Sequence, residues 1–155
     1  MLVNKTLIMN CYSPQIMRYN KVGDKVIVRI DRGEEIVETL KQICRTLDIK
    51  LGTITGIGAT DKVKIGLYNI SSKQYRSKEL SSDHEIAPLY GNITTMNNDV
   101  YIHLHVNLCN SEHKSFGGHL NSAIVSATFE AVIEIINSKI ERIFDEKIGL
   151  NLLDI

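Results

Sequence analysis

The stretch Tyr101-Ile102-His103-Leu104-His105-Val106-Asn107-Leu108 decides the fold class, because its side chains alternate between apolar and polar. A period of two predicts a β-strand with one buried face and one polar face. His103 and His105 fall together on the polar face, where positions i and i+2 lie about 6.8 Å apart. The sequence is therefore expected to present two neighbouring imidazoles on one side of a sheet.

Two imidazoles at this spacing can bind one divalent metal ion if a third ligand comes from elsewhere. His119 is the candidate, because Gly117 and Gly118 before it allow the backbone to bend close to the site. Three neutral imidazoles suit zinc and, less selectively, nickel, cobalt or iron. The alternative is that these histidines form hydrogen bonds to neighbouring residues or subunits without a metal.

The rest of the chain predicts mainly β-structure around one helix. The helix is expected from Glu34 to Leu47, where apolar residues recur at helical spacing behind an acidic first turn. Gly56-Ile57-Gly58 begins like a dinucleotide-binding motif, but residue 61 is Asp, so we interpret it as a bend or bulge between strands. Strands are expected at residues 25–30, 51–57, 63–68, 74–80 and 89–95, over most of 123–136, and once or twice within 141–155.

Length and composition are those of one globular domain. The chain has 155 residues, of which 43% are hydrophobic and 23% charged. No apolar run approaches the roughly 18 residues of a membrane span, and the first residues do not form a signal peptide, so a cytoplasmic location is expected. Cys11, Cys44 and Cys109 are too scattered for a disulfide framework and are expected to be reduced thiols.

The net charge is zero, with 18 basic and 18 acidic residues. A dedicated nucleic-acid-binding protein usually carries a basic excess. The charges are nevertheless uneven, since residues 1–80 contain 14 basic and 8 acidic side chains and residues 81–155 contain 4 and 10. This asymmetry is compatible with a basic surface, and equally with contacts between subunits.

Other polar residues suggest further roles. Glu130 lies in an apolar stretch and is expected to need a partner: a ligand histidine, an arginine such as Arg32, or a group across a subunit boundary, with a simple ion pair favoured. His84 and His113 lie in polar surroundings and are expected to be exposed to solvent. No catalytic constellation is found in the sequence, which lacks a Gly-x-Ser-x-Gly motif.

Several short motifs together resemble the PPC domain, the plants and prokaryotes conserved domain, in its prokaryotic single-domain form. The most specific is the His-x-His pair followed about a dozen residues later by Gly117-Gly118-His119-Leu120. The resemblance covers residues 17–155 and leaves residues 1–16 as an N-terminal extension. The other matching segments are Gly33-Glu34-Glu35, Gly56-Ile57-Gly58-Ala59, Glu85-Ile86, Gly91-Asn92-Ile93 and Thr128-Phe129-Glu130-Ala131-Val132.

The resemblance implies an α+β fold, a mostly antiparallel twisted sheet with one main amphipathic helix, that assembles as a homotrimer. It also implies that His103, His105 and His119 cluster and hold a divalent metal such as zinc. In plant relatives the domain follows AT-hooks, Arg-Gly-Arg-Pro segments that enter the DNA minor groove. Here the only Arg-Gly is Arg32-Gly33, followed by Glu34, so this route to DNA is missing from the sequence.

Three functions are consistent with the sequence. The leading prediction is a trimeric DNA-binding or regulatory protein with a three-histidine metal site, for which the resemblance identifies no DNA-contacting residues. The second is a metal-dependent enzyme or small-ligand-binding protein that does not bind DNA. The third is a self-assembling interaction scaffold in which the histidines contribute to interfaces between subunits.

Overall fold

The computed structural model describes residues 17–155, so the expected N-terminal extension and Cys11 lie outside the described residues. This part of the chain forms one helix and nine strands. The helix is α1 (Ile36–Thr46). The strands are β1 (Arg18–Val22), β2 (Lys25–Asp31), β3 (Gly52–Asn69), β4 (Gln74–Leu80), β5 (His84–Met96), β6 (Asp99–Cys109), β7 (Ser115–Ile135), β8 (Arg142–Asp145) and β9 (Leu150–Leu153).

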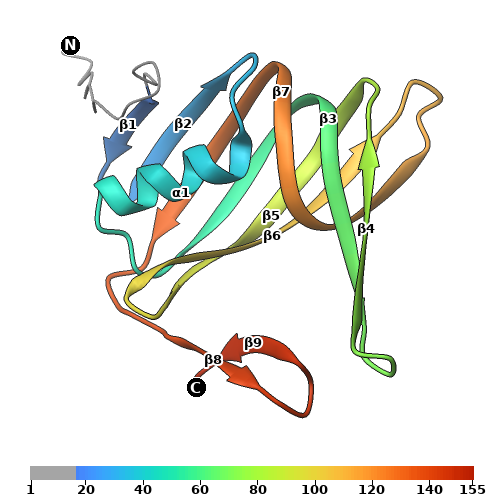
Figure 1. The fold of residues 1–155 in the computed structure, drawn as a ribbon. Coiled ribbons are helices and arrows are strands. Elements are labelled where there is room, and N and C mark those ends of the chain that lie inside the picture. The colour runs from blue at the N-terminus through green and yellow to red at the C-terminus, as the bar shows by residue number, and fades with distance from the viewer. Residues whose placement is uncertain (1–16) are drawn as a thin grey trace, which may run out of the picture.

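Seven strands form one antiparallel sheet in the order β1-β2-β7-β6-β5-β3-β4. Strand β7 is 21 residues long and pairs with three strands: its first residues with β6, and its later residues with β2 and β3. Because β3 also pairs with β5, and β5 with β6, the strands β3, β5, β6 and β7 form a closed circuit of pairings. Figure 1 shows the resulting strong curvature of β3 and β7. The predicted mostly antiparallel twisted sheet with a single helix is confirmed.

Strand β3 runs without a break through two segments that the sequence predicts as separate strands, 51–57 and 63–68. The separation was wrong, because the glycines between them do not turn the chain back. They produce register shifts, the first between Gly56 and Gly58, so that the strand stays paired while it bends. At Gly58 a Cβ atom would lie 2.3 Å from the carbonyl oxygen of Thr128, so glycine lets β3 and β7 approach closely.

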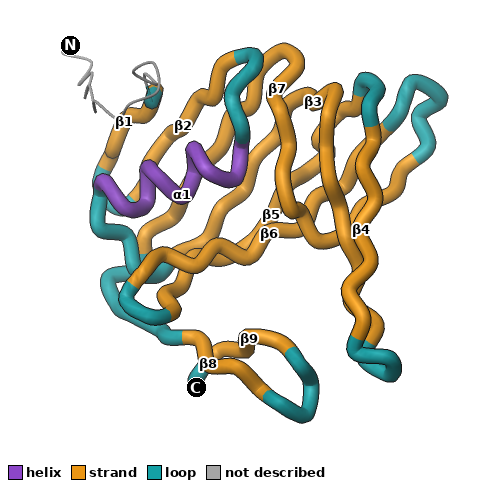
Figure 2. Tube along the Cα trace, in the orientation of Figure 1, coloured by secondary structure: helices purple, strands orange, loops and turns teal. Residues whose placement is uncertain are grey.

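Helix α1 covers the concave side of the sheet (Figure 2). Glu35 caps its N-terminus, since the carboxylate accepts a hydrogen bond from the backbone N–H of Glu38 at 2.6 Å. The other oxygen of Glu35 accepts the backbone N–H of Ala123 in β7 at 2.8 Å. One side chain therefore both starts the helix and ties it to the sheet.

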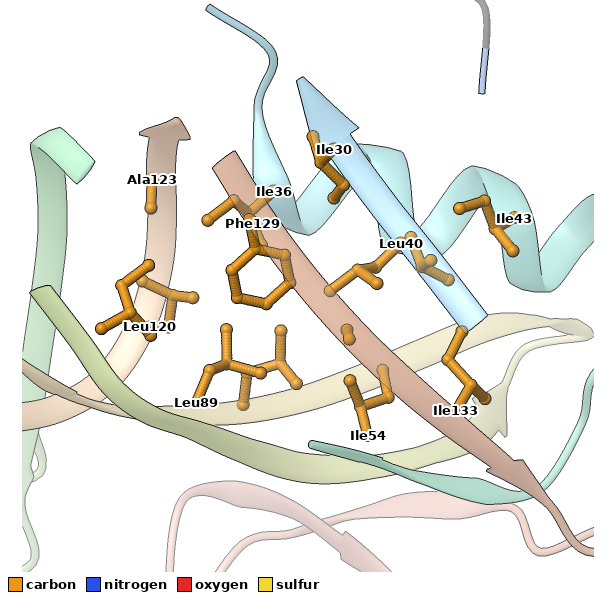
Figure 3. Close-up of a cluster of buried hydrophobic side chains, with 14 of the residues drawn as sticks. Ile30, Ile36, Leu40, Ile43, Ile54, Leu89, Leu120, Ala123, Phe129 and Ile133 are labelled. Carbon is orange, nitrogen blue, oxygen red and sulfur yellow. The ribbon is translucent and has the colours of Figure 1, made fainter. Parts of the chain in front are cut away.

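The hydrophobic core lies between α1 and the sheet (Figure 3). Phe129 of β7 is fully buried at its centre, and Ile30, Leu40, Ile54 and Leu89 bring four further elements to the same cluster. Burying such side chains contributes about 1.5–3 kcal/mol each to folding, so this cluster holds the helix against the sheet. Side chains on the opposite face of the sheet do not contribute to this core.

The C-terminal strands β8 and β9 form a separate two-stranded sheet. The hairpin is attached to the main sheet by the Tyr68 hydroxyl, which donates to the carbonyl of Ile148 at 2.9 Å, and by the Lys73 ammonium, which donates to the carbonyl of Glu146 at 2.7 Å. The expectation of one or two short strands here is confirmed. Among residues 17–155, no helix has the length and apolar character needed to cross a membrane.

Candidate metal centre

Strand β6 has the alternation predicted from its sequence. Leu104, Val106 and Leu108 are buried in the core. His103 and His105 lie on the opposite face, where His103 is half-buried and His105 exposed. The pleat of one regular strand therefore separates the two ligand candidates from the core.

His119 reaches the same face from the neighbouring strand. It is the direct cross-strand partner of His105 in the β6–β7 pairing. Gly117 and Gly118 do not form the expected bend before it, because both lie within β7 and pair with β6. A Cβ at Gly117 would lie 2.1 Å from the carbonyl oxygen of Val106, so glycine permits close packing of two strands there.

The three imidazoles form a compact cluster. The ring centroid of His103 lies 5.1 Å from that of His105 and 5.1 Å from that of His119, and the remaining pair is 5.6 Å apart. One ligand nitrogen from each ring can be chosen so that all three lie within 4.8 Å of one another. Nitrogens bound to one tetrahedral zinc are about 3.4 Å apart, so small side-chain rotations suffice to close the set. The residues present fit a divalent metal.

The surroundings favour neutral imidazoles, the form that binds metal. Burial lowers the pKa of His103 to about 4, with further lowering by the positive charges of His119, Arg142 and His105. Burial also lowers the pKa of His119, and His105 adds to this effect. At neutral pH these two side chains thus carry free lone pairs.

Arg142 of β8 forms one side of the site, and the sequence analysis missed it. It is 7% exposed, and its guanidinium carbon lies 4.9 Å from the centroid of the Tyr101 ring. It donates hydrogen bonds to Thr94, Asn92 and the carbonyl of Asn151 at 2.8–2.9 Å. The only sequence signal was a lone arginine at the start of a short apolar strand, which matches no motif.

Tyr75 of β4 forms another side. Its ring packs edge-on against His119 with centroids 6.2 Å apart, and its hydroxyl donates to the side-chain oxygen of Asn121 at 2.7 Å. The ring occupies the space that a side chain at Gly66 would fill, because a Cβ there would meet the ring and its hydroxyl. Gly66 is the partner of His119 in β3, so its missing side chain makes room for Tyr75.

The remaining predicted residues lie elsewhere. Glu130 is exposed, and in the register of the sheet it lies opposite Arg29 of β2 and Ile57 of β3. It forms no ion pair with Arg32, which is also exposed. A role for Glu130 or Arg32 between subunits or behind a ligand stays a prediction.

The expectation for His84 was wrong. It is only 5% exposed, because its ring packs edge-on against Phe116 and its Nδ1 lies 2.6 Å from the carbonyl oxygen of Ser82. His113 is exposed as expected. Cys44 and Cys109 are free thiols, as expected, and burial raises the pKa of Cys44 to about 12.

Solved structures similar to this chain share its fold over about nine tenths of its length. A crystal structure described as a putative DNA-binding protein from Bacteroides thetaiotaomicron is 38% identical, with a TM-score of 0.87 over 89% of this chain and 96% of that one. A metal-containing protein from Archaeoglobus fulgidus is 32% identical, with a TM-score of 0.78 over 90% and 98%. A plant- and prokaryote-conserved (PPC) protein from Pyrococcus horikoshii is 30% identical, with a TM-score of 0.77 over 90% and 94%.

A search of curated proteins found no match. The family model of the Plants and Prokaryotes Conserved (PCC) domain matches residues 17–137, which include the helix, the core strands and all three clustered histidines. This is the family that the His-x-His and Gly-Gly-His-Leu motifs suggested. The chain belongs to the Plants and Prokaryotes Conserved domain family.

Proposed function

We propose that this protein binds a divalent metal ion, with zinc favoured, through His103, His105 and His119. The observation that carries the proposal is the convergence of three ligand nitrogens within 4.8 Å on one face of the sheet. The similar protein from Archaeoglobus fulgidus is described as metal-containing, which supports the assignment. Three protein ligands leave one position open on a tetrahedral ion, where the metal can bind a small ligand or activate water.

Metal analysis of the purified protein tests this proposal. Elemental analysis after zinc loading and desalting is expected to find about one ion per chain, and His103→Ala is expected to lose it. His113→Ala is the matched control, because it removes an exposed histidine outside the cluster and keeps the ion. Unchanged metal content in His103→Ala would show that the ligands are wrong.

We also propose that the chain assembles as a homotrimer through the outer face of the sheet. Ile27, Val132, Thr55 and Tyr90 follow one another as cross-strand partners over β2, β7, β3 and β5, and the next partner of Tyr90 is His105. Ile27 and Ile57, which are 46% and 61% exposed, border an apolar groove of about 630 Å³. Tyr90 is 59% exposed and is the cross-strand partner of Thr55, which also lines the groove. Exposed apolar surface of this extent is typical of an interaction site.

Sedimentation of the purified protein tests this assembly. A trimer is expected, and Ile57→Glu is expected to dissociate it, because a charge buried without a partner is costly. Leu67→Glu, on the same strand and 72% exposed, is the control. A stable monomer of the natural chain would contradict the proposal, and with it the alternative that the protein is a self-assembling scaffold.

DNA binding is a second candidate function, and one surface favours it. The hairpin of β3 and β4 carries Lys62, Lys64, Lys73, Arg76 and Lys78. Its two acidic residues, Asp61 and Glu79, lie at the base of the hairpin, where Glu79 forms an ion pair with Lys64. A two-stranded ribbon of this kind fits the major groove, and its cations suit phosphates. The similar protein from Bacteroides thetaiotaomicron is described as a putative DNA-binding protein.

A salt-dependent mobility shift with duplex DNA tests this candidate. Binding is expected at low salt and is expected to weaken steeply as salt rises. Arg76→Glu with Lys78→Glu should weaken it strongly, whereas Lys21→Glu on the opposite edge strand, β1, should not. Absence of binding at low salt would contradict DNA binding and leave the metal proposal unaffected.

A further inference from the structure

Arg142 is a buried cation without an anionic partner. Only 7% of the residue is exposed, and no carboxylate within residues 17–155 lies within 4.0 Å of its guanidinium. Three of the more exposed arginines differ: Arg18, Arg29 and Arg45 each contact an aspartate. Because buried charges in proteins are normally paired, the position points to an anion that is not part of the described residues.

The hydrogen bonds of Arg142 are all to neutral groups. They go to the Thr94 hydroxyl, the Asn92 side-chain oxygen and the Asn151 carbonyl. A guanidinium has five N–H donors, so two remain after these three bonds. The partners hold the group in a fixed orientation while leaving its charge unbalanced.

Two structural relationships place this cation beside the histidines. Asn92, which accepts from Arg142, is the direct cross-strand partner of His103. Tyr101, against which the guanidinium stacks, precedes His103 by two residues on the same face of β6. The guanidinium is therefore connected to His103 by two neighbours, Asn92 on β5 and Tyr101 on β6.

A divalent ion on three neutral imidazoles would add two positive charges beside this guanidinium, and no carboxylate belongs to the ligand cluster among the described residues. We propose that the site takes a small carboxylate, bound jointly by the open position of the metal and by Arg142. The planar guanidinium matches the two oxygens of a carboxylate. This inference rests on the proposed metal binding and adds the chemical class of the ligand.

A purely structural role for Arg142 makes a different prediction. The residue also connects β9 to β5, through Asn151 and Thr94, and such an anchor would not depend on whether a free anion is present. The experiment must therefore measure anion binding separately from folding and from metal binding.

The probe is acetate, added to protein loaded with Co²⁺, whose visible absorption reports changes in its ligands. Acetate is expected to change the spectrum with saturation, whereas acetamide, which has the same shape without the charge, is expected to have little effect. Inorganic phosphate is compared in parallel and is expected to bind more weakly than acetate. Equal responses to acetate and acetamide, or no response to acetate, would overturn the proposal, and tighter phosphate binding would overturn the assignment to carboxylates.

Asn92→Asp is the decisive variant. It keeps Arg142 and its hydrogen bond but gives the guanidinium an internal carboxylate, so the dissociation constant for acetate is expected to rise about tenfold or more. Asn20→Asp adds the same charge on β1, the edge strand of the sheet, and is expected to leave the dissociation constant for acetate unchanged. Arg142→Gln should weaken acetate binding as much as Asn92→Asp does, while Co²⁺ stays bound. If Arg142→Gln does not fold, the result for Asn92→Asp decides.

The outcomes separate this inference from the metal proposal. If all folded variants bind Co²⁺ but Asn92→Asp and the natural chain have equal affinity for acetate, the proposed role of Arg142 is wrong. The metal proposal is then unaffected. Absence of any Co²⁺ spectrum in the natural chain overturns the metal proposal and this inference with it.

Discussion

His105 of β6 and His119 of β7 face each other as direct cross-strand partners, with ring centroids 5.6 Å apart and ring planes at 85°. Their separation is set by the hydrogen-bonded register of two strands, with no loop involved. His103 completes the set from the next same-side position of β6, at 5.1 Å from each ring. Because the three side chains project from paired strands, the backbone alone holds them close together.

Metal removal is expected to lower the thermal stability of the protein. A ligand present at 100 times its dissociation constant stabilises the folded state by about 2.7 kcal/mol. The zinc-loaded chain should therefore unfold at a higher temperature than the chelator-treated chain in differential scanning calorimetry. In His103→Ala the two curves should coincide, and a persistent difference there would place the ion elsewhere.

The metal-free protein is expected to lose stability as the pH falls from about 6.5 to about 4. The pKa of His103 is about 4 in the folded chain and 6.5 in its ordinary state, so the unfolded chain takes up the proton first. His119, whose pKa is also lowered, acts in the same direction. Urea unfolding should show that the free energy of unfolding falls less over this pH range in His103→Gln than in the natural chain. Equal losses in both would contradict the shift.

Gly117→Ala is expected to be more harmful than Gly66→Ala. At Gly117 the new methyl group meets the backbone carbonyl of Val106 at 2.1 Å, so β6 and β7 must move apart. At Gly66 it meets the side chain of Tyr75, which is 44% exposed and can rotate away. Urea unfolding should give a loss of about 1–3 kcal/mol for Gly117→Ala and a smaller one for Gly66→Ala. The reverse order would contradict this account of the strand contact.

Glu35→Ala is expected to destabilise the fold by about 1–2 kcal/mol, because it removes the helix cap and the bond to β7 together. The two carboxylate oxygens accept separate N–H groups, those of Glu38 and Ala123. Glu35→Gln keeps one acceptor oxygen and should lose only part of this free energy. Chemical unfolding monitored by circular dichroism checks the order, and equal losses would show that only one of the two bonds matters.

Strand β6, which carries His103 and His105, could be predicted because its signal is local. The start of β7, which carries His119, was expected to bend at Gly117 and Gly118. Alternation over residues 101–108 determines which side chains are buried, and the structure buries Leu104, Val106 and Leu108 as expected. The helix is predicted equally well, with Ile36, Leu40 and Ile43 on its buried side. In both cases a single periodicity covers the whole element.

The length of β3 and the position of Arg142 beside the histidines could not be predicted, because both depend on residues that are distant in the sequence. The bend or bulge predicted at Gly56 and Gly58 is present as a register shift. That the strand continues through it depends on β5 and β7, which pair with both parts of β3. His84 looks exposed until Phe116, far along the chain, packs on it. Arg142 acquires its neighbours Asn92 and Tyr101 only when the C-terminal hairpin folds back onto the sheet.

All three imidazoles project from one hairpin, β6 and β7, on the side away from the buried core. The hydrophobic core and the histidine cluster therefore lie on different faces of the sheet, so mutations can change the three histidines while the fold persists. Homologues lacking these histidines would be expected to keep the same shape, so inheritance of the shape alone is no guide to whether a given member carries an ion.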